Sequence, residues 1–262
     1  MNKIDQKLAQ LAKEKRLGLM THVIVGYPSI PQTLEIVQEM ERAGVDFVEL
    51  QIPFSDPLAD GPTIMKACEV ALENGTKVKD AFLVAKKLSQ QVSIPLLFMG
   101  YFNTVFKYGL KKFCADAKAS GVSGLIIPDA PLEEADGQDL ERQCLRNDLC
   151  LIRLLAPSST KERMQLNAKK AKGFLYCTAR QGITGAMNKL DPQVADYLKT
   201  VKKNVKVPLA VGFGISSKER VEMIRPYCQI AVVGSAIVDL ITSSPKDEVL
   251  ANIHQFIQGL EV

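Results

Sequence analysis

Residues 49–62 have the sequence ELQIPFSDPLADGP, and this stretch organises our interpretation of the chain. The apolar run at 45–50 that leads into it predicts a β-strand, and three prolines and a glycine then exclude a continuous helix or central strand. Two carboxylates frame the loop, Glu49 near the strand end and Asp60 beyond it. A carboxylate at an inward strand position must be hydrogen-bonded, paired or neutralised, and burial would prepare it for proton transfer near neutral pH. The spacing leaves open whether Glu49 transfers protons or is an outward-facing or ion-paired strand residue.

Length and composition favour a single domain over residues 1–262. The chain has 262 residues, a natural length for one (β/α)8 barrel, and 47% of them are hydrophobic. The net charge of +4 is small, and no dense Lys/Arg run alternates with aromatic residues, so nucleic-acid binding has little support. No apolar run is long enough to span a membrane, and no linker or low-complexity segment divides the chain.

The cysteines and the N-terminal segment indicate the cellular compartment. The six cysteines show no CxxC or zinc-ligand spacing, which fits free thiols in a reducing cytosol. Residues 1–16 are charged and amphipathic and do not resemble a signal peptide. We therefore expect a cytoplasmic protein, and we expect no metal site because no convincing ligand cluster is present.

Short apolar runs alternate with amphipathic segments along the whole chain. The runs predict eight strands, at 19–25, 45–52, 95–99, 123–127, 150–155, 173–177, 208–211 and 229–233. Helices are predicted at 2–15, 32–42, 63–73, 79–90, 110–119, 132–146, 160–171, 191–202, 216–225 and over much of 236–259.

This alternation predicts the α/β class and a (β/α)8 TIM barrel with an extra N-terminal helix. Strands with little polar alternation suit a parallel sheet that helices cover on the outside, and eight units in this length favour closure. The helix at 2–15 could cap the closed end of the barrel or lie on the surface as a solvated helix. A doubly wound open sheet is the alternative fold, since periodicity does not prove closure.

In such a barrel the carboxyl ends of the strands carry the chemistry. Glycines in the loops after the seventh and eighth strands could let the backbone approach a phosphate, a common site in this fold, or could merely form tight turns. Candidate substrate-binding residues at or just after the strand ends are Tyr101, Asp129, Tyr176, Phe213, Gly214, Gly234 and Ser235.

Three further features have more than one interpretation. The glycine-bearing loop at 180–185 could be a lid that excludes water from a bound substrate or an ordinary surface loop. His22, in the first strand, could shuttle a proton or be a satisfied pocket or core histidine, whereas His254 in the last helix is expected at the surface. Cys177 is expected to pack rather than to act as a nucleophile, because no histidine is near it in sequence.

The stretch at 49–62 closely resembles the signature of tryptophan synthase alpha subunits, a strand Glu followed by P-F-S-D-P-x-A-D-G-P. The resemblance extends over essentially the whole chain and includes GYFN at 100–103, PDAP at 128–131, KGFLY at 172–176, GITG at 182–185, VGFGI at 211–215 and VGSAIV at 233–238. It implies a TIM barrel that cleaves indole-3-glycerol phosphate into indole and glyceraldehyde 3-phosphate without metal or cofactor. It also implies a beta-subunit partner, in an alpha2beta2 tetramer, that joins indole to serine with pyridoxal phosphate.

The resemblance also implies roles for individual residues. Glu49 would protonate indole C3 and help remove a proton from the glycerol hydroxyl, and Asp60 would hydrogen-bond the indole N–H. Tyr176 would pack beside Glu49, and Thr184 would reach toward Asp60 when the lid closes. The phosphate would be held by Gly185, Gly214, Gly234 and Ser235, and the beta subunit would face the loop that contains Pro53, Asp56 and Pro57.

The sequence departs from the family pattern at three places. Gln51 stands where the family commonly has Gly, His22 replaces an aromatic that lines the indole pocket, and Asn103-Thr104 replaces an Asn-Pro pair. These differences bear on the pocket and on coupling to the partner. Two other functions therefore stay open at this point: an alpha-like subunit that mainly activates a beta subunit, and a different phosphate-binding barrel enzyme such as an isomerase.

Overall fold

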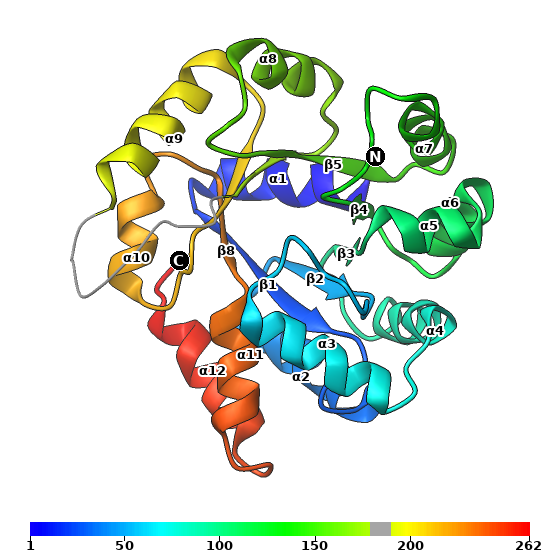
Figure 1. The fold of residues 1–262 in the computed structure, drawn as a ribbon. Helices are drawn as coiled ribbons and strands as arrows, with labels where there is room; N and C mark the ends of the chain where they lie inside the picture. The colour runs from blue at the N-terminus through cyan, green and yellow to red at the C-terminus, as the bar shows by residue number, and fades with distance from the viewer. Residues whose placement is uncertain (179–189) are drawn as a thin grey trace.

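Eight parallel strands form a closed barrel in the computed structural model, which describes residues 1–178 and 190–262 (Figure 1). Every strand pairs with the next along the chain, and β8 pairs with β1 to complete the ring. The predicted TIM barrel is thus confirmed, and the open sheet is excluded. The strands are β1 Gly18–Ile24, β2 Phe47–Gln51, β3 Leu96–Met99, β4 Gly124–Ile126, β5 Cys150–Leu155, β6 Leu175–Thr178, β7 Leu209–Gly212 and β8 Ile230–Val233.

Helices surround the ring of strands (Figure 1). The helices of the described residues are α1 Lys3–Glu14, α2 Ile30–Ala43, α3 Pro62–Glu73, α4 Val78–Leu88, α5 Phe102–Tyr108, α6 Leu110–Ala119, α7 Ala135–Arg146, α8 Lys161–Lys170, α9 Pro192–Asn204, α10 Lys218–Ile224, α11 Ser235–Ser243 and α12 Val249–Gly259.

Two helical predictions need correction. The sequence pattern predicts no helix between 100 and 109, but the segment after β3 forms α5, whose first amide is capped by the Asp129 carboxylate (Phe102 N to Oδ1, 2.8 Å). The single helix expected over much of 236–259 is two helices, α11 and α12, because Pro245 lies between them and cannot continue the hydrogen-bond ladder.

Strand alternation divides the apolar side chains into two layers. Along β2, Val48 and Leu50 pack outward against the helices, whereas Phe47 belongs to the cluster inside the barrel. Because successive side chains point to opposite faces, Glu49 and Gln51 share the inward face with Phe47. The barrel interior is therefore apolar at the amino ends of the strands and polar near their carboxyl ends.

Helix α1 closes the amino end of the barrel, as one of the two interpretations predicted. Its buried Ile4 and Leu11 join the interior cluster with Phe47 and Phe174. The strand glycines make this contact possible: a Cβ on Gly124 would lie 2.8 Å from Ile4 Cδ1. The chemistry is thereby confined to the opposite, open end.

Candidate active site

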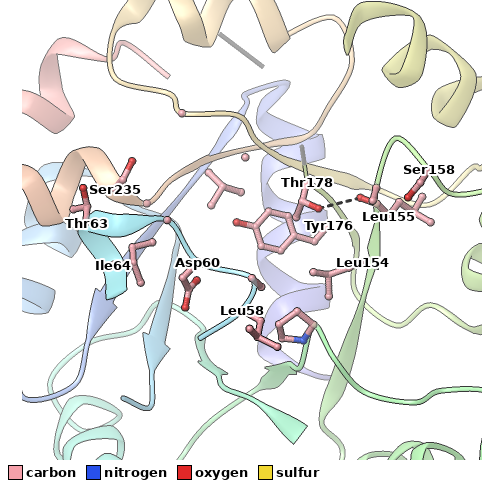
Figure 2. A pocket seen from close by; sticks show the side chains of 18 of the residues that line it. Leu58, Asp60, Thr63, Ile64, Leu154, Leu155, Ser158, Tyr176, Thr178 and Ser235 are labelled. Atoms are coloured by element: carbon pink, nitrogen blue, oxygen red, sulfur yellow. Dashed lines mark hydrogen bonds between the residues drawn. The ribbon is translucent and has the colours of Figure 1, made fainter. Parts of the chain in front are cut away.

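A cavity of about 990 Å³ opens at the carboxyl end of the barrel. Its lining comes from the ends of β5–β8 and from the loops after β2, β4, β5, β7 and β8. Figure 2 shows Asp60 and Tyr176 on facing sides of this cavity, with the Tyr176 hydroxyl directed toward Asp60 and Ile64. The cavity thus brings together strand ends that are far apart in sequence.

Glu49 is buried beside this cavity in contact with a histidine. The pairing of β1 with β2 places His22 directly opposite Glu49, and their Nδ1 and Oε2 atoms are 2.8 Å apart. Only 2% of Glu49 and 3% of His22 is exposed. The other carboxylate oxygen, Oε1, has no hydrogen-bond partner among the described residues. Glu49 therefore faces inward, which excludes the outward-facing interpretation, and it is paired with His22.

Asp60 lines the cavity and is held by two side chains from the barrel. Gln51 Nε2 and the Tyr101 hydroxyl both donate to Asp60 Oδ2, at 2.7 and 2.9 Å. The same hydroxyl accepts from the amide of Ala59 at 3.0 Å, and Phe54 stacks on the Tyr101 ring with 5.2 Å between centroids. Tyr101 thus acts by fixing the loop and its carboxylate, and it is itself buried.

Burial and the two carboxylates together set the acidity of the neighbouring groups. Burial raises the pKa of the Tyr176 hydroxyl, and the charges of Glu49 and Asp60 raise it further. Burial by itself lowers the pKa of His22, but the hydrogen bond and charge of Glu49, aided by Asp60 and Gln51, outweigh it and raise the pKa above its ordinary value. Tyr176 therefore stays protonated near neutral pH and can donate a hydrogen bond.

The opposite side of the cavity offers backbone groups and a helix terminus. Gly214, Gly234 and Ser235 line the cavity, and α11 begins at Ser235, so its first amides lie at the rim. Gly214 has a positive φ of +63° that favours glycine, and Arg220 Nη1 donates to its carbonyl oxygen at 2.6 Å. A helix start and glycine turns at adjacent loops form a favourable anion site.

Comparison with known proteins decides the family. The family model for the tryptophan synthase alpha chain matches residues 8–261. The chain belongs to the tryptophan synthase alpha chain family. It is similar to the alpha chain of Thermoanaerobacter sp. (strain X514), with 40% identity over 262 residues that cover 100% of this chain and 99% of the relative. The alpha chain of Dehalococcoides mccartyi is 44% identical over 251 residues, 95% of this chain and 98% of the relative.

Solved alpha-chain structures agree with this family assignment. An alpha chain from Legionella pneumophila superposes with a TM-score of 0.89 at 29% identity and covers 99% of this chain and 96% of the relative. A tryptophan synthase chain from M. tuberculosis, in an aminoacrylate-bound form, gives a TM-score of 0.87 at 28% identity and covers 99% and 98%. Membership makes this chain a lyase of tryptophan biosynthesis whose family works with a beta subunit.

Several residues predicted for the site lie elsewhere or outside the described structure. The Phe213 side chain is buried in the outer core, because Gly212 faces Tyr176 inside the barrel and the next residue must face outward. Asp129 caps α5 and does not line the cavity. Thr184 and Gly185, with the rest of the 180–185 loop, fall outside the described residues.

The loop predicted to face a partner has a mixed character. Pro53 and Pro57 are buried, whereas Asp56 is exposed and accepts from the Ser55 hydroxyl at 2.6 Å. Leu58 is 81% exposed and lines the cavity mouth. The two prolines therefore shape the loop, and Asp56 and Leu58 present its outer surface.

Some members of the site were not predicted. Thr63 and Ile64 from α3 and a segment after β5 that includes Ser158 and Arg163 also line the cavity. The AP pair at 156–157 marked a strand end, and barrel closure would have placed the segment after it at the rim. The expected surface position of His254 agrees with its partial exposure, although it also hydrogen-bonds Glu39 at 2.6 Å.

The described parts of the chain contain no helix that is long and apolar enough to cross a membrane. Nor do they contain a group of three or more His, Cys, Asp or Glu arranged to hold a metal ion. All six cysteines are free and buried, and Cys177 lies in the outer core, which fits the packing role expected for it.

Proposed function

We propose that this chain cleaves indole-3-glycerol phosphate to indole and glyceraldehyde 3-phosphate by acid–base retro-aldol chemistry. One observation carries the proposal: a buried glutamate with a free carboxylate oxygen lies beside a cavity whose opposite rim is a glycine turn and a helix start. Such a cavity fits a substrate with a reactive aromatic end and an anionic end.

In this proposal Glu49 first protonates C3 of the indole ring, which makes the ring an electron acceptor. The same carboxylate then takes the proton from the hydroxyl on the adjacent glycerol carbon. The carbon–carbon bond breaks, the former hydroxyl becomes the aldehyde oxygen, and the bonding electrons restore the indole ring. Acid–base assistance of this kind contributes about 10²–10⁴-fold. Because the protonated ring accepts the bonding electrons and no net oxidation or reduction occurs, this chemistry requires neither metal nor cofactor.

The other proposed roles follow from position. Asp60, held by Gln51 and Tyr101, would accept the indole N–H and stabilise the positive charge on the protonated ring. Gly214, Gly234 and Ser235 would bind the phosphate with backbone amides and a hydroxyl at the start of α11. Gly185 and Thr184 belong to this proposal on the family resemblance alone.

The family partnership suggests where a beta subunit docks. We place it on the outer surface of the 53–59 loop, where Asp56 and Leu58 are exposed next to Asp60. Contact there could transmit the state of the partner to the Asp60 carboxylate. An alpha2beta2 assembly and a cytoplasmic location belong to the same proposal.

Product analysis tests the activity. Purified chain is incubated with indole-3-glycerol phosphate, with and without a beta subunit that lacks bound serine, and indole and glyceraldehyde 3-phosphate are quantified. We expect both products in equal amounts, and we expect Glu49→Gln and Asp60→Asn each to reduce them by about 100-fold or more. Wild-type protein that matches the Glu49→Gln blank in both reactions would contradict the proposal. Activation of the beta reaction without indole release would favour the partner-only function.

A further inference from the structure

Two polar side chains stand between the two carboxylates of the site and contact one of them each. His22 Nδ1 lies 2.8 Å from Glu49 Oε2, and Gln51 Nε2 donates to Asp60 Oδ2 at 2.7 Å. Glu49 and Gln51 are two residues apart on β2 and so face the same side, and His22 on β1 lies directly opposite Glu49. The four side chains are therefore neighbours on the interior wall of the barrel.

Three buried atoms of this group have no hydrogen-bond partner among the described residues: Glu49 Oε1, His22 Nε2 and Gln51 Oε1. Buried polar atoms are rarely left unpaired, because each loses its hydration without compensation. His22 Nε2 and Gln51 Oε1 are complementary, since a protonated Nε2 donates a hydrogen bond and the amide oxygen accepts one. Gln51 is also among the groups that favour the protonated form of His22. The remaining atom, Glu49 Oε1, is the oxygen that the proposed reaction uses.

We propose that His22 and Gln51 are positioning residues that join Glu49 and Asp60 into one hydrogen-bonded chain. His22 fixes the carboxyl group of Glu49 through Oε2, so that Oε1 stays free for the proton transferred to substrate. Gln51 fixes Asp60 through its amide nitrogen and binds His22 through its amide oxygen when Nε2 is protonated. This inference rests on the proposed function, because it assigns Glu49 and Asp60 to one reaction.

In this hydrogen-bonded chain, His22 also acts electrostatically on catalysis. Once Glu49 Oε1 has given its proton to C3, the carboxylate lies next to the imidazole, and a cationic imidazole stabilises it until it takes the hydroxyl proton. Glu49 and Asp60 are the charged groups that act on His22 from β2 and the loop after it, and Tyr176 from β6 lies in the field of both. From the β8 side, Gly234 approaches the His22 Cβ and brings no charge.

The sign of the pH dependence follows from these contacts. The carboxylates raise the pKa of His22 above its ordinary value of 6.5 despite burial. The imidazole is therefore cationic below that raised value and becomes neutral as the pH rises through it. We expect kcat for indole release to decline over the same pH range.

The hydrogen-bonded chain through His22 and Gln51 can be tested without any substrate. The sequence has only two histidines, so His254→Asn leaves His22 as the single imidazole signal in a spectrum of ¹⁵N-histidine-labelled protein. In that background we expect His22 to titrate above 6.5. Adding Glu49→Gln should lower the titration midpoint strongly, and Gln51→Met should lower it less. One midpoint shared by all three proteins would overturn the inference.

Kinetics then separate orientation from charge. His22→Asn keeps a hydrogen-bond donor near the place of Nδ1 but removes the titrating group. His22→Phe removes both the donor and the titrating group. We expect His22→Phe to lose about 10- to 100-fold in kcat at every pH, as misplacement of a reacting group commonly does. His22→Asn should retain kcat within about tenfold and lose the alkaline decline. Gln51→Met should lower kcat about tenfold. The double variant His22→Phe/Gln51→Met should lose less kcat than the product of the two single losses, because both substitutions break the same hydrogen-bonded chain.

The matched control is the partly exposed pair of His254 with Glu39, whose Nδ1 and Oε1 atoms are 2.6 Å apart. Its removal by His254→Asn should leave kcat and its pH profile at the wild-type values. Wild-type protein that releases no indole would refute the proposed function while the spectroscopic result stands. Active wild-type protein whose rate and pH profile His22→Phe leaves unchanged would refute the positioning role alone.

Discussion

Tyr101 provides a sharp test of how the loop carboxylate is held, because its hydroxyl makes two hydrogen bonds that Phe cannot make. One goes to Asp60 Oδ2 at 2.9 Å and the other comes from Ala59 N at 3.0 Å. A bond to a charged acceptor contributes about 1.5–3 kcal/mol and a neutral one about 0.5–1.5 kcal/mol. Ala59 is exposed, so water can bind its amide, and Gln51 still donates to Asp60. Part of the lost hydrogen-bond free energy is therefore recovered. We expect Tyr101→Phe to lower the free energy of unfolding by about 1–3 kcal/mol, or the melting temperature by about 2–12 °C.

The catalytic loss should exceed what this destabilisation explains. Asp60 retains only its bond to Gln51 and becomes free to turn, so we expect kcat for indole release to fall about 10- to 100-fold. Initial rates measured well below the melting temperature keep the two effects apart. The matched control is Tyr108→Phe, which removes a hydroxyl bonded to Asp116 at 2.5 Å, outside the cavity. Tyr101→Phe with the wild-type kcat, or an equal loss of kcat in Tyr108→Phe, would refute this account of the loop.

Three further predictions concern the barrel and its buried groups. Ile4→Ala removes a buried side chain beneath the strands and should lower the free energy of unfolding by about 2–5 kcal/mol. Its control, Leu83→Ala at an exposed position, should lower it by less than about 0.5 kcal/mol. Equal urea midpoints for the two variants would contradict the capping role of α1. Because the pKa of His22 is raised on folding, the stability it adds is fully present below 6.5 and is lost as the pH rises through the raised value. Wild type should therefore exceed His22→Asn in unfolding free energy by more in acid than in alkali, and a pH-independent difference in urea titrations would argue otherwise. Burial raises the pKa of Cys68 to about 11 and that of Cys228 to about 12. A thiol reagent near pH 8 should therefore label the native protein slowly, and it should label all six cysteines after unfolding. Rapid labelling of Cys68 or Cys228 in the native protein would count against this packing.

Much of the fold could be predicted from the sequence because the strands are short apolar runs and most of them are followed directly by Gly or Pro. The prediction of one helix over 236–259 was wrong because it gave no weight to Pro245, which separates α11 from α12. The helix at 102–108 was missed because its amino-terminal cap comes from Asp129, which is distant in sequence. Local pattern cannot supply a cap from another loop.

The site was predictable to the extent that its residues follow strand ends. Glu49 stood out because an acidic residue in an apolar strand is unusual, and Asp60 because it follows in the loop just beyond the end of that strand. The contact of His22 with Glu49 depends on the register between β1 and β2, and that of Tyr101 with Asp60 depends on the packing of β3 beside the loop. Neither register is visible in a single run of residues. The outward direction of Phe213, in contrast, follows from alternation once Gly212 is placed inside.

The most direct test of the central claim is the rate of a single turnover, with enzyme in excess over indole-3-glycerol phosphate, in wild type and in Glu49→Gln. This measurement isolates carbon–carbon cleavage from product release. We predict that Glu49→Gln forms indole at least about 100-fold more slowly while its melting temperature and its affinity for glycerol 3-phosphate stay close to those of wild type. Indole formation by Glu49→Gln at the wild-type rate would contradict the claim that this buried carboxyl group transfers the proton.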